Sequence, residues 1–98
     1  MTYRLSARAE SDLTEIWVYS AEEWGVDQAD RYVDALLRRF SWLTGNRTLW
    51  KDRLDISEGI YCYPEQSHII YFRPFVSDGA GLEILRVLHK RMDPSGHL

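Results

Sequence analysis

The stretch 82–93, which reads LEILRVLHKRMD, constrains the fold of this chain more than any other. It begins as an aliphatic run of the length expected for a strand buried inside a sheet, and it ends in a group of charged residues. Because side chains alternate along a strand, we expect the even-numbered residues of Ile84–Lys90 on one face and the odd-numbered residues of Leu85–Arg91 on the other. Arg86 must then face water, a partner or a carboxylate, since a guanidinium is almost never buried unpaired.

The chain is large enough for one domain with a core of two layers. It has 98 residues, of which 45% are hydrophobic and 13% aromatic, so it should fold rather than remain disordered. Its single cysteine, Cys62, excludes an internal disulfide framework and a cysteine-based zinc site. No apolar run reaches the ~18 to 20 residues of a membrane span, and the first residues resemble a strand rather than a signal peptide. We expect a cytoplasmic protein without a membrane partner.

Charge is distributed unevenly along the chain, whose net charge is -3. Residues 1–35 carry three basic side chains against eight acidic ones, and the remainder carries nine basic against seven acidic. Broad binding to a phosphate backbone depends on many lysine and arginine contacts. We therefore expect no direct sequence-specific binding of nucleic acid.

Two helices are predicted after a short first strand at 2–5. Ser6 is a suitable N-cap for a helix that starts at about Ala7 and ends at Gly25, and Asp27 is a suitable cap for a second helix that ends at Gly45-Asn46. The apolar stripes of the two helices are Ala9, Leu13, Ile16, Trp17, Ser20 and Trp24 in the first, and Ala29, Tyr32, Val33, Leu36, Phe40 and Leu43 in the second. Their short connection predicts an antiparallel hairpin.

The second half of the chain has the pattern of strands. Residues 47–59 show no period and are interpreted as a connection, with Trp50, Leu54 and Ile56 as anchors on the core. Strands are expected at 60–63, at 68–75 and, after a glycine-rich turn at 77–81, in the stretch 82–93. We predict an α+β fold of order β-α-α-β-β-β, with the helical hairpin on one face of a four-stranded, mainly antiparallel sheet of order 1-4-3-2.

Motifs along nearly the whole chain resemble the ParE branch of the RelE/ParE toxin superfamily. The most specific of them joins an apolar strand to a fixed pattern of Arg, His and Asp at its end. The residues that carry the likeness are Tyr3-Arg4-Leu5-Ser6 with Ala9, Asp12-Leu13, Ile16 and Tyr19, Trp24-Gly25, Gln28-Ala29 and Tyr32, and Ile84-Leu85-Arg86-Val87-Leu88-His89 with Arg91-Met92-Asp93.

The resemblance implies the toxin of a toxin–antitoxin pair, expressed with a ParD-like antitoxin that wraps the toxin and binds operator DNA. ParE-like toxins are associated with inhibition of DNA gyrase, whereas RelE-like relatives cut messenger RNA on the ribosome. We expect a non-catalytic gyrase inhibitor without a metal or cofactor. The alternatives are a ribosome-dependent mRNA endonuclease and an inactive relative kept as an antitoxin-binding module.

RNA cleavage requires an acid, a base and cations beside the phosphate. Arg86, His89, Lys90 and Arg91 are of suitable type, but the acidic first half would repel RNA, and Tyr61 stands where the superfamily often has Arg. Simpler interpretations remain open. Arg86 would then form a structural ion pair with a carboxylate such as Asp55, Glu83 or Asp93, His89 would bond to backbone, and Cys62 would pack in the core.

We place the toxic, target-binding surface at the end of the stretch 82–93. Its predicted residues are Arg86, His89, Lys90, Arg91, Met92 and Asp93, followed by a tail at 93–98 that we expect to be mobile until a partner holds it.

We place the antitoxin contact on the helices. Val18 and Tyr19 lie off the first stripe and Trp42 lies off the second, so large apolar groups are expected at the surface. An antitoxin helix in a groove needs such anchors. The predicted antitoxin-binding residues are Val18, Tyr19, Arg38, Arg39 and Trp42. The alternative is that 47–59 or the tail covers them.

Overall fold

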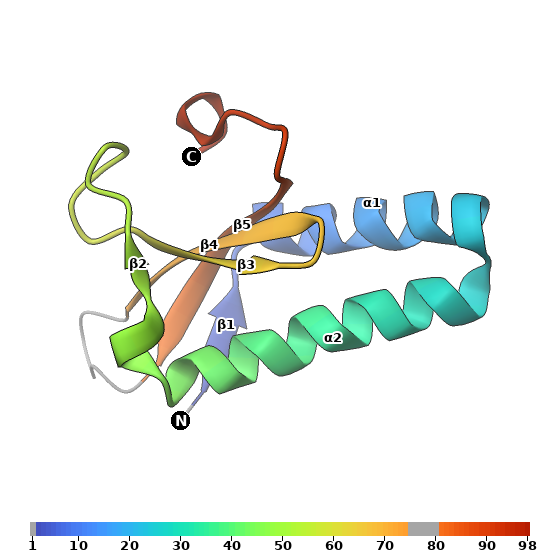
Figure 1. The fold of residues 1–98 in the computed structure, drawn as a ribbon, viewed down its shortest axis with the longest axis horizontal. Coiled ribbons are helices and arrows are strands. Elements are labelled where there is room, and N and C mark those ends of the chain that lie inside the picture. Colours follow the sequence, from blue (N-terminus) through green and yellow to red (C-terminus); the bar gives the residue numbers. More distant parts are fainter. Residues whose placement is uncertain (1, 75–80) are drawn as a thin grey trace.

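The structure, a computed structural model, describes residues 2–74 and 81–98 of the chain (Figure 1). Helices and strands follow one another in the predicted order, with one short strand and two short 3-10 turns in addition. The elements are β1 (Tyr3–Leu5), α1 (Ala7–Trp24), α2 (Val26–Thr44), η1 (Arg47–Leu49), β2 (Lys51–Asp52), β3 (Tyr61–Glu65), β4 (His68–Pro74), β5 (Leu82–His89) and η2 (Pro94–Gly96). The predicted glycine-rich turn lies mostly outside the described residues.

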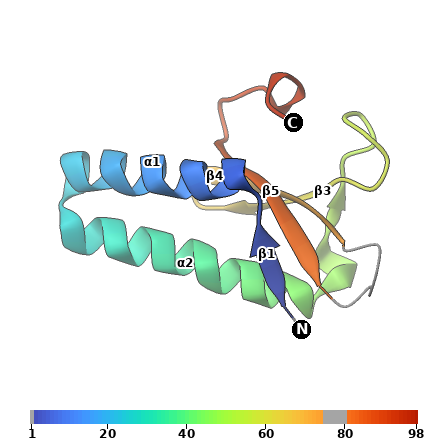
Figure 2. The same ribbon diagram turned by 180° about the vertical axis from the view of Figure 1, so that it is seen from behind.

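The sheet is mixed, with the order β1-β5-β4-β3-β2. β1 runs parallel to β5, which it flanks in Figure 2, and the other neighbours are antiparallel. The predicted α+β fold and the order of the four predicted strands are confirmed. β2 is a fifth strand at the edge, inside the segment that we interpreted as a connection; two residues are too few to show alternation.

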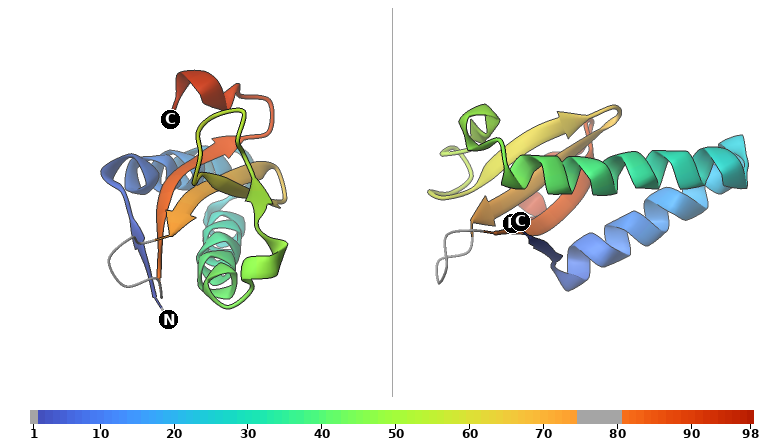
Figure 3. Two further views of the ribbon diagram at one scale, coloured as in Figure 1. Left: turned by 90° about the vertical axis from the view of Figure 1, so that its left-hand side faces the viewer. Right: turned by 90° about the horizontal axis from the view of Figure 1, so that it is seen from below.

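The two helices form the predicted hairpin, and they extend beyond the sheet at the connected end (Figures 1 and 3). Their buried stripes pack on one face of the sheet, on alternate residues of the central strands. The core consists of Ala9, Leu13, Ile16, Leu36, Phe40, Leu43, Ile70, Phe72, Leu82, Ile84 and Val87. β5 lies inside the sheet between β1 and β4, as the sequence predicted.

The ends of the helices differ in part from the prediction. Ser6 caps α1 by accepting a hydrogen bond from the backbone N–H of Ala9 at 3.0 Å, as expected. Gly25 both ends α1 and begins α2 at φ +95°, a backbone conformation that favours glycine, so Asp27 is not the cap. Trp24, predicted in the core, is 70% exposed because α1 has by then passed the edge of the sheet.

A β-bulge in β5 breaks the predicted alternation of side chains. Tyr71 pairs with Arg86 and Phe72 pairs with Ile84, so Leu85 is an extra residue. Val87 therefore joins Ile84 in the core under the helices, whereas Leu88 packs in a second cluster on the opposite face. The prediction that all even-numbered residues share one face is wrong beyond the bulge.

The second cluster covers the face of the sheet away from the helices. It consists of Cys62, Tyr71 and Leu88, with Ile56 and Ile69 packed against it. Ile56 and Trp50 are the anchors predicted for the connection, and the Trp50 indole donates to the carbonyl of Leu43. The third predicted anchor, Leu54, is wrong, since its side chain is 68% exposed.

Candidate functional site

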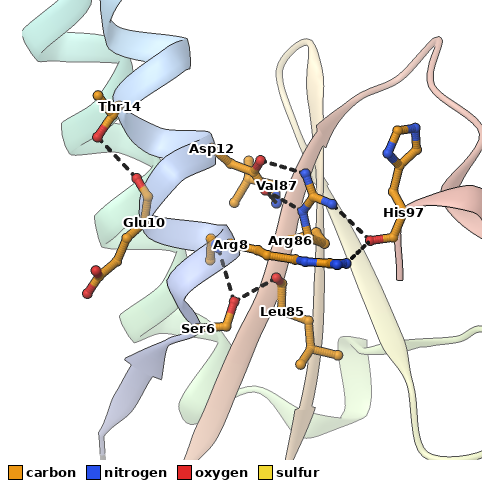
Figure 4. A network of polar contacts seen from close by, with 10 residues as sticks. Ser6, Arg8, Glu10, Asp12, Thr14, Leu85, Arg86, Val87 and His97 are labelled. Atoms are coloured by element: carbon orange, nitrogen blue, oxygen red, sulfur yellow. Dashed lines mark hydrogen bonds and ion pairs between the residues drawn. The ribbon is translucent and has the colours of Figure 1, made fainter.

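An ion pair joins the middle of α1 to the bulged part of β5 (Figure 4). Arg86 donates two hydrogen bonds of 2.8 Å to the carboxylate of Asp12, and the same carboxylate accepts from the backbone N–H of Val87 at 2.9 Å. Both side chains are largely buried, with 16% and 8% of their surface exposed. The bond to Asp12 raises the pKa of Arg86 above its usual value, so Arg86 is permanently charged here.

This pairing confirms the simpler interpretation of Arg86, a structural ion pair with a carboxylate. The partner is Asp12, however, and none of the three carboxylates that we named as examples, Asp55, Glu83 and Asp93. Asp55 pairs with Arg53, Glu83 accepts from Arg73, and Asp93 caps η2 by accepting from the backbone N–H of Ser95. A signal for Asp12 was present in the sequence. It lies three residues after Ala9 on the buried stripe of α1, where a carboxylate requires a cation.

The same guanidinium holds the C-terminal tail. Arg86 donates to the backbone carbonyl of His97 at 2.9 Å, and Arg8 donates to the same oxygen at 3.3 Å (Figure 4). Asp93 adds a capped turn, η2, which places His97 over α1 and β5. The tail, which we expected to be mobile until something holds it, is thus hydrogen-bonded to α1 and β5 of the chain itself.

Ser6 ties the start of α1 to the bulge beside this pair. Its hydroxyl donates to the carbonyl of Leu85 at 2.8 Å (Figure 4). Its backbone N–H donates to the carbonyl of Ile84 at 3.0 Å. The extra residue of the bulge thus has a partner for its carbonyl group. The arrangement fixes the register in which Asp12 meets Arg86.

A pocket of about 450 Å³ lies next to the ion pair, between α1 and the end of β5. We call it the α1–β5 pocket. Its apolar wall includes Tyr19 and Trp24 from α1 and Leu88 and Met92 from the strand end. The complete lining is Asp12, Glu15, Ile16, Tyr19, Trp24, Tyr32, Ser67, His68, Arg86, Val87, Leu88, His89 and Met92.

Two histidines, His68 and His89, belong to the polar part of the pocket, together with Asp12, Glu15, Ser67 and Arg86. The hydroxyl oxygen of Tyr32 accepts from the backbone N–H of Ser67 at 3.1 Å and lies 2.7 Å from Nδ1 of His68. Burial, helped by the neighbouring His89, lowers the pKa of His68 to about 4, so its ring is neutral at pH 7. The Tyr32 hydroxyl and Nδ1 share one hydrogen bond, whose donor is set by the tautomer of the ring. The ring centroids of His68 and His89 are 5.4 Å apart.

The predicted toxic surface is brought together only in part. Arg86, His89 and Met92 line the α1–β5 pocket, whereas Lys90 and Arg91 are exposed beyond it. Nδ1 of His89 accepts from the backbone N–H of Arg91 at 3.2 Å, which is the backbone contact that we considered for this histidine. His68, Tyr32 and Ser67 belong to the same site but were missed, because their proximity depends on the β3–β4 turn reaching α2.

The predicted antitoxin-binding residues fall into two groups. Val18 and Tyr19 are 45% and 61% exposed, and Tyr19 lines the α1–β5 pocket. Arg38, Arg39 and Trp42 line a different hollow on α2 together with Glu65. α2 and the C-terminal segment lie on opposite sides of the molecule (Figures 1 and 3).

Trp42 is covered more than the helical pattern indicated. It is half-buried against Tyr63, with ring centroids 5.3 Å apart, and the guanidinium of Arg39 lies 4.6 Å from the centre of its ring. Arg39 is held there by Glu65 at 2.7 Å. The covering groups come from α2 and β3, and not from the segment 47–59 or the tail.

Within the described ranges 2–74 and 81–98, neither helix is apolar over a sufficient length to cross a membrane. No three His, Cys, Asp or Glu side chains in these ranges are grouped so that they could hold a metal ion.

Residues 3–94 match the family model described as "ParE toxin of type II toxin-antitoxin system, parDE". The chain belongs to the ParE toxin family. It is 34% identical over 96 residues to Toxin ParE1 of Caulobacter vibrioides, which covers 98% of this chain and 96% of the relative. The predicted membership of the RelE/ParE superfamily is confirmed, and the chain is a toxin of a type II toxin–antitoxin system.

Solved structures of toxin–antitoxin systems share the fold of this chain. One is described as the chromosomal ParDE TA system from P. aeruginosa, with a TM-score of 0.74, 19% identity and coverage of 91% of this chain and 95% of that chain. Another is the toxin–antitoxin complex RelBE2 from Mycobacterium tuberculosis, with a TM-score of 0.68, 18% identity and coverage of 93% and 92%. At these identities the likeness concerns the fold.

Proposed function

We propose that this ParE-type toxin acts in the cytoplasm by binding and inhibiting DNA gyrase, and that a ParD-like antitoxin neutralises it. The observation that carries the proposal is the match to the ParE family over residues 3–94. The matching relatives are named as ParE toxins. The resemblance to that branch of the superfamily implies inhibition of gyrase rather than RNA cleavage. No cofactor is needed for inhibition by binding.

The state of Arg86 favours a binding protein over a nuclease. A cation that stabilises a reacting phosphate must be free to meet it. Here the guanidinium is committed to Asp12 by two bonds and to the carbonyl of His97 by a third. Tyr61, in the position where the superfamily often has Arg, packs against Trp50 and Phe72 in the core. Both residues support the structure of β5 and its neighbours.

One observation favours the alternative function, that of a ribosome-dependent mRNA endonuclease. The imidazoles of His68 and His89 lie side by side, and Lys90 and Arg91 follow directly. Neighbouring histidines can exchange protons during the cleavage of a phosphodiester. The low pKa of His68 keeps it neutral but makes it a weak base at pH 7.

The two functions are separated by a pair of assays on the purified toxin. Supercoiling of relaxed plasmid by gyrase should fall as toxin is added, while messenger RNA in a translation extract should stay intact. Unaffected supercoiling together with cleaved messenger RNA would replace the gyrase proposal by the endonuclease. A chain that does neither, and does not arrest growth, would be an inactive relative.

The geometry of the site indicates which surface would contact the target. We propose that the target contacts the exposed end of β5, with His89, Lys90, Arg91, Met92 and Asp93 at the surface. Arg86 takes part by fixing this strand end to α1 and to the tail. A compact basic rim of this kind suits an acidic or DNA-competing surface on gyrase.

We propose that the antitoxin contacts Val18 and Tyr19 on α1 and the hollow of Arg38, Arg39 and Trp42 on α2. Replacement of Trp42 by Ala should weaken antitoxin binding by about 2 kcal/mol or more if it is a hot spot. Arg31→Ala, on an exposed part of the same helix, serves as the control. An unchanged affinity of a folded Trp42 variant, measured by calorimetry, would assign this tryptophan to packing against Tyr63.

A further inference from the structure

The C-terminal tail, residues 93–98, is attached to the rest of the molecule at one point. Its other hydrogen bonds are local, since Asp93 accepts from Ser95 and the carbonyl of Pro94 accepts from the backbone N–H of His97 at 3.0 Å. In the part of the chain that the structure describes, the hydrogen bonds between the tail and other elements all end at the carbonyl oxygen of His97. The position of the tail therefore depends on the donors to that oxygen.

Two guanidinium groups from different elements share this oxygen (Figure 4). Arg86 donates to it at 2.9 Å and Arg8 donates at 3.3 Å. Arg86 is also fixed by its two bonds to Asp12, which do not involve the tail. Arg8 is exposed, and no ion pair engages it within residues 2–74 and 81–98. The bond to the tail thus accounts for the placement of the Arg8 side chain.

Arg8 stands where a helix disfavours a cation. It lies in the first turn of α1, two residues after the N-cap Ser6, and the positive end of the helix dipole is unfavourable for a guanidinium. It also precedes Asp12 by four residues, so both side chains lie on the face of α1 that meets β5. Local preferences of this kind are broken mainly at functional sites. The position of Arg8 is therefore explained by its contact with the tail rather than by the helix.

The bonds to His97 close a loop that contains the proposed target surface. Arg86 and His97 are the ends of this loop, and the segment His89–Asp93 lies between them. The turn after β5 is ordered in addition by the backbone N–H of Met92, which donates to the carbonyl of His89 at 2.9 Å. A loop with joined ends has fewer conformations than a free chain end, so it loses less entropy when a target binds it.

Packing contributes little to the attachment of the tail. A pocket of about 230 Å³ lies between the end of the tail, the bulge of β5 and the start of α1, with Ala7, Leu85 and Leu98 in its lining. The side chain of Leu98 is 37% exposed. Segments with few buried apolar contacts open at a low free energy. Loss of one of the two hydrogen bonds to His97 should therefore change the order of the tail.

We propose that Arg8 is a positioning residue for the target surface. Its bond to the carbonyl of His97 keeps the loop 86–97 closed and holds His89–Asp93 in the arrangement that the target binds. Arg8 acts through the tail and does not contact the target. This inference rests on the proposed function, and it adds a residue at the start of α1 that lies outside both proposed surfaces.

An exposed arginine can also attract a target by charge alone. The two roles differ in their dependence on the tail, because attraction by charge operates with or without it. A chain that ends at Pro94 lacks the carbonyl of His97 but keeps His89–Asp93. Residues that act as a unit are recognised by effects that do not add. Arg8→Ala should therefore have an effect in the full chain and none in the shortened chain.

The test measures affinity for purified DNA gyrase in the full chain and in the chain that ends at Pro94, each with and without Arg8→Ala. In the full chain we expect binding to weaken about five-fold, as for the loss of one hydrogen bond, and in the shortened chain to change less than about two-fold. The matched control is Arg31→Ala, an exposed arginine on α2, which should bind within about two-fold of wild type. Equal weakening in both chains, or no weakening in the full chain, would overturn the inference.

A second measurement follows the tail without a target. In ¹⁵N relaxation of the free toxin, the amides of Ser95 and His97 should be ordered in wild type and in Arg31→Ala, and mobile in Arg8→Ala. Arg8→Lys, which keeps a donor for the carbonyl, should restore part of this order. A tail that stays ordered in Arg8→Ala would overturn the inference, whatever the effect on binding.

Failure of the proposed function is recognised separately. Wild-type toxin would then not bind gyrase, and growth arrest would replace gyrase affinity in the same comparison of variants. Weaker arrest by Arg8→Ala in the full chain alone would support the positioning role for another target. Unchanged arrest by this variant would overturn it.

Discussion

At the scale of residues, the ion pair of Asp12 and Arg86 connects every part of the site. The carboxylate accepts from Arg86 and from the backbone of Val87, and the guanidinium also reaches the tail at His97. A buried pair of this kind is more important for geometry than for net stability, since desolvation offsets much of the attraction. Removal of only one of the two partners leaves the other as an unpaired buried charge.

We predict that Asp12→Asn lowers the free energy of unfolding by about 3 kcal/mol, because Arg86 is left without its carboxylate. Arg73→Ala breaks an exposed pair with Glu83 and should cost less than about 1 kcal/mol. Urea denaturation measures both values. Equal effects of the two substitutions would show that Asp12 and Arg86 behave as an ordinary surface pair.

His68 makes stability depend on pH. Burial holds its pKa at about 4 in the folded protein, below the usual 6.5, so the unfolded chain takes up the proton first as the pH falls. Above about pH 6.5 the titration of this histidine does not change the free energy of unfolding. We predict that it progressively lowers this free energy as the pH falls from about 6.5 to about 4.

The matched variant is His68→Asn, whose side-chain amide can still form a hydrogen bond with the Tyr32 hydroxyl. Melting temperatures at pH 7.5 and pH 5 should differ less in this variant than in wild type. Wild-type protein with the same difference as the variant would contradict the role of His68. Asp12 and His89, which also act on this ring, are present in both proteins.

At the scale of elements, the sequence was sufficient to predict the helical hairpin and the order of the main strands. Both follow from long periodic patterns and from Ser6 as a cap, which are local signals. The bulge at Leu85 was not predictable, because it depends on the register of β5 against β4. Trp24 was misplaced because a stripe shows which side of a helix is apolar, but not where the sheet ends.

The site was predicted less completely than the fold for the same reason. Arg86, His89 and Tyr19 were found because charge or exposure is visible in the pattern of one element. Tyr32 and His68 belong to different elements and meet only through tertiary structure. The tail was expected to be mobile because its single tertiary acceptor, the carbonyl of His97, has no sequence signal.

A deletion can distinguish the contribution of the tail to toxicity from that of the end of β5. Removal of residues 93–98 takes away one hydrogen bond to Arg86 but leaves its ion pair, so we predict a loss of about 2 kcal/mol in stability and retained antitoxin binding. We expect growth inhibition to be strongly reduced. The control is Lys90→Ala/Arg91→Ala, which should lose toxicity without the loss of stability, since both side chains are exposed.

Two outcomes would contradict this assignment. A deletion variant that unfolds, measured by circular dichroism, would show that the tail is required for the fold rather than for toxicity. If both variants remain folded and fully toxic, the target surface is on the helices instead.

At the scale of the whole molecule, the uneven distribution of charge along the sequence places acidic and basic side chains on different surfaces. The acidic residues lie mostly on the helical hairpin, and the basic end of β5 lies beside the α1–β5 pocket. The protein thus presents a short basic rim rather than the broad basic face that RNA binding requires. This arrangement is consistent with a ParE-type toxin that acts through protein contacts.

The most direct test of this account is the affinity of the purified toxin for purified DNA gyrase, measured by biolayer interferometry for wild type and for Lys90→Ala/Arg91→Ala. We predict saturable binding of the wild type and at least about ten-fold weaker binding of the folded double variant, which corresponds to about 1.4 kcal/mol. Absence of wild-type binding, or equal binding of both proteins, would contradict a toxin that inhibits gyrase through the end of β5.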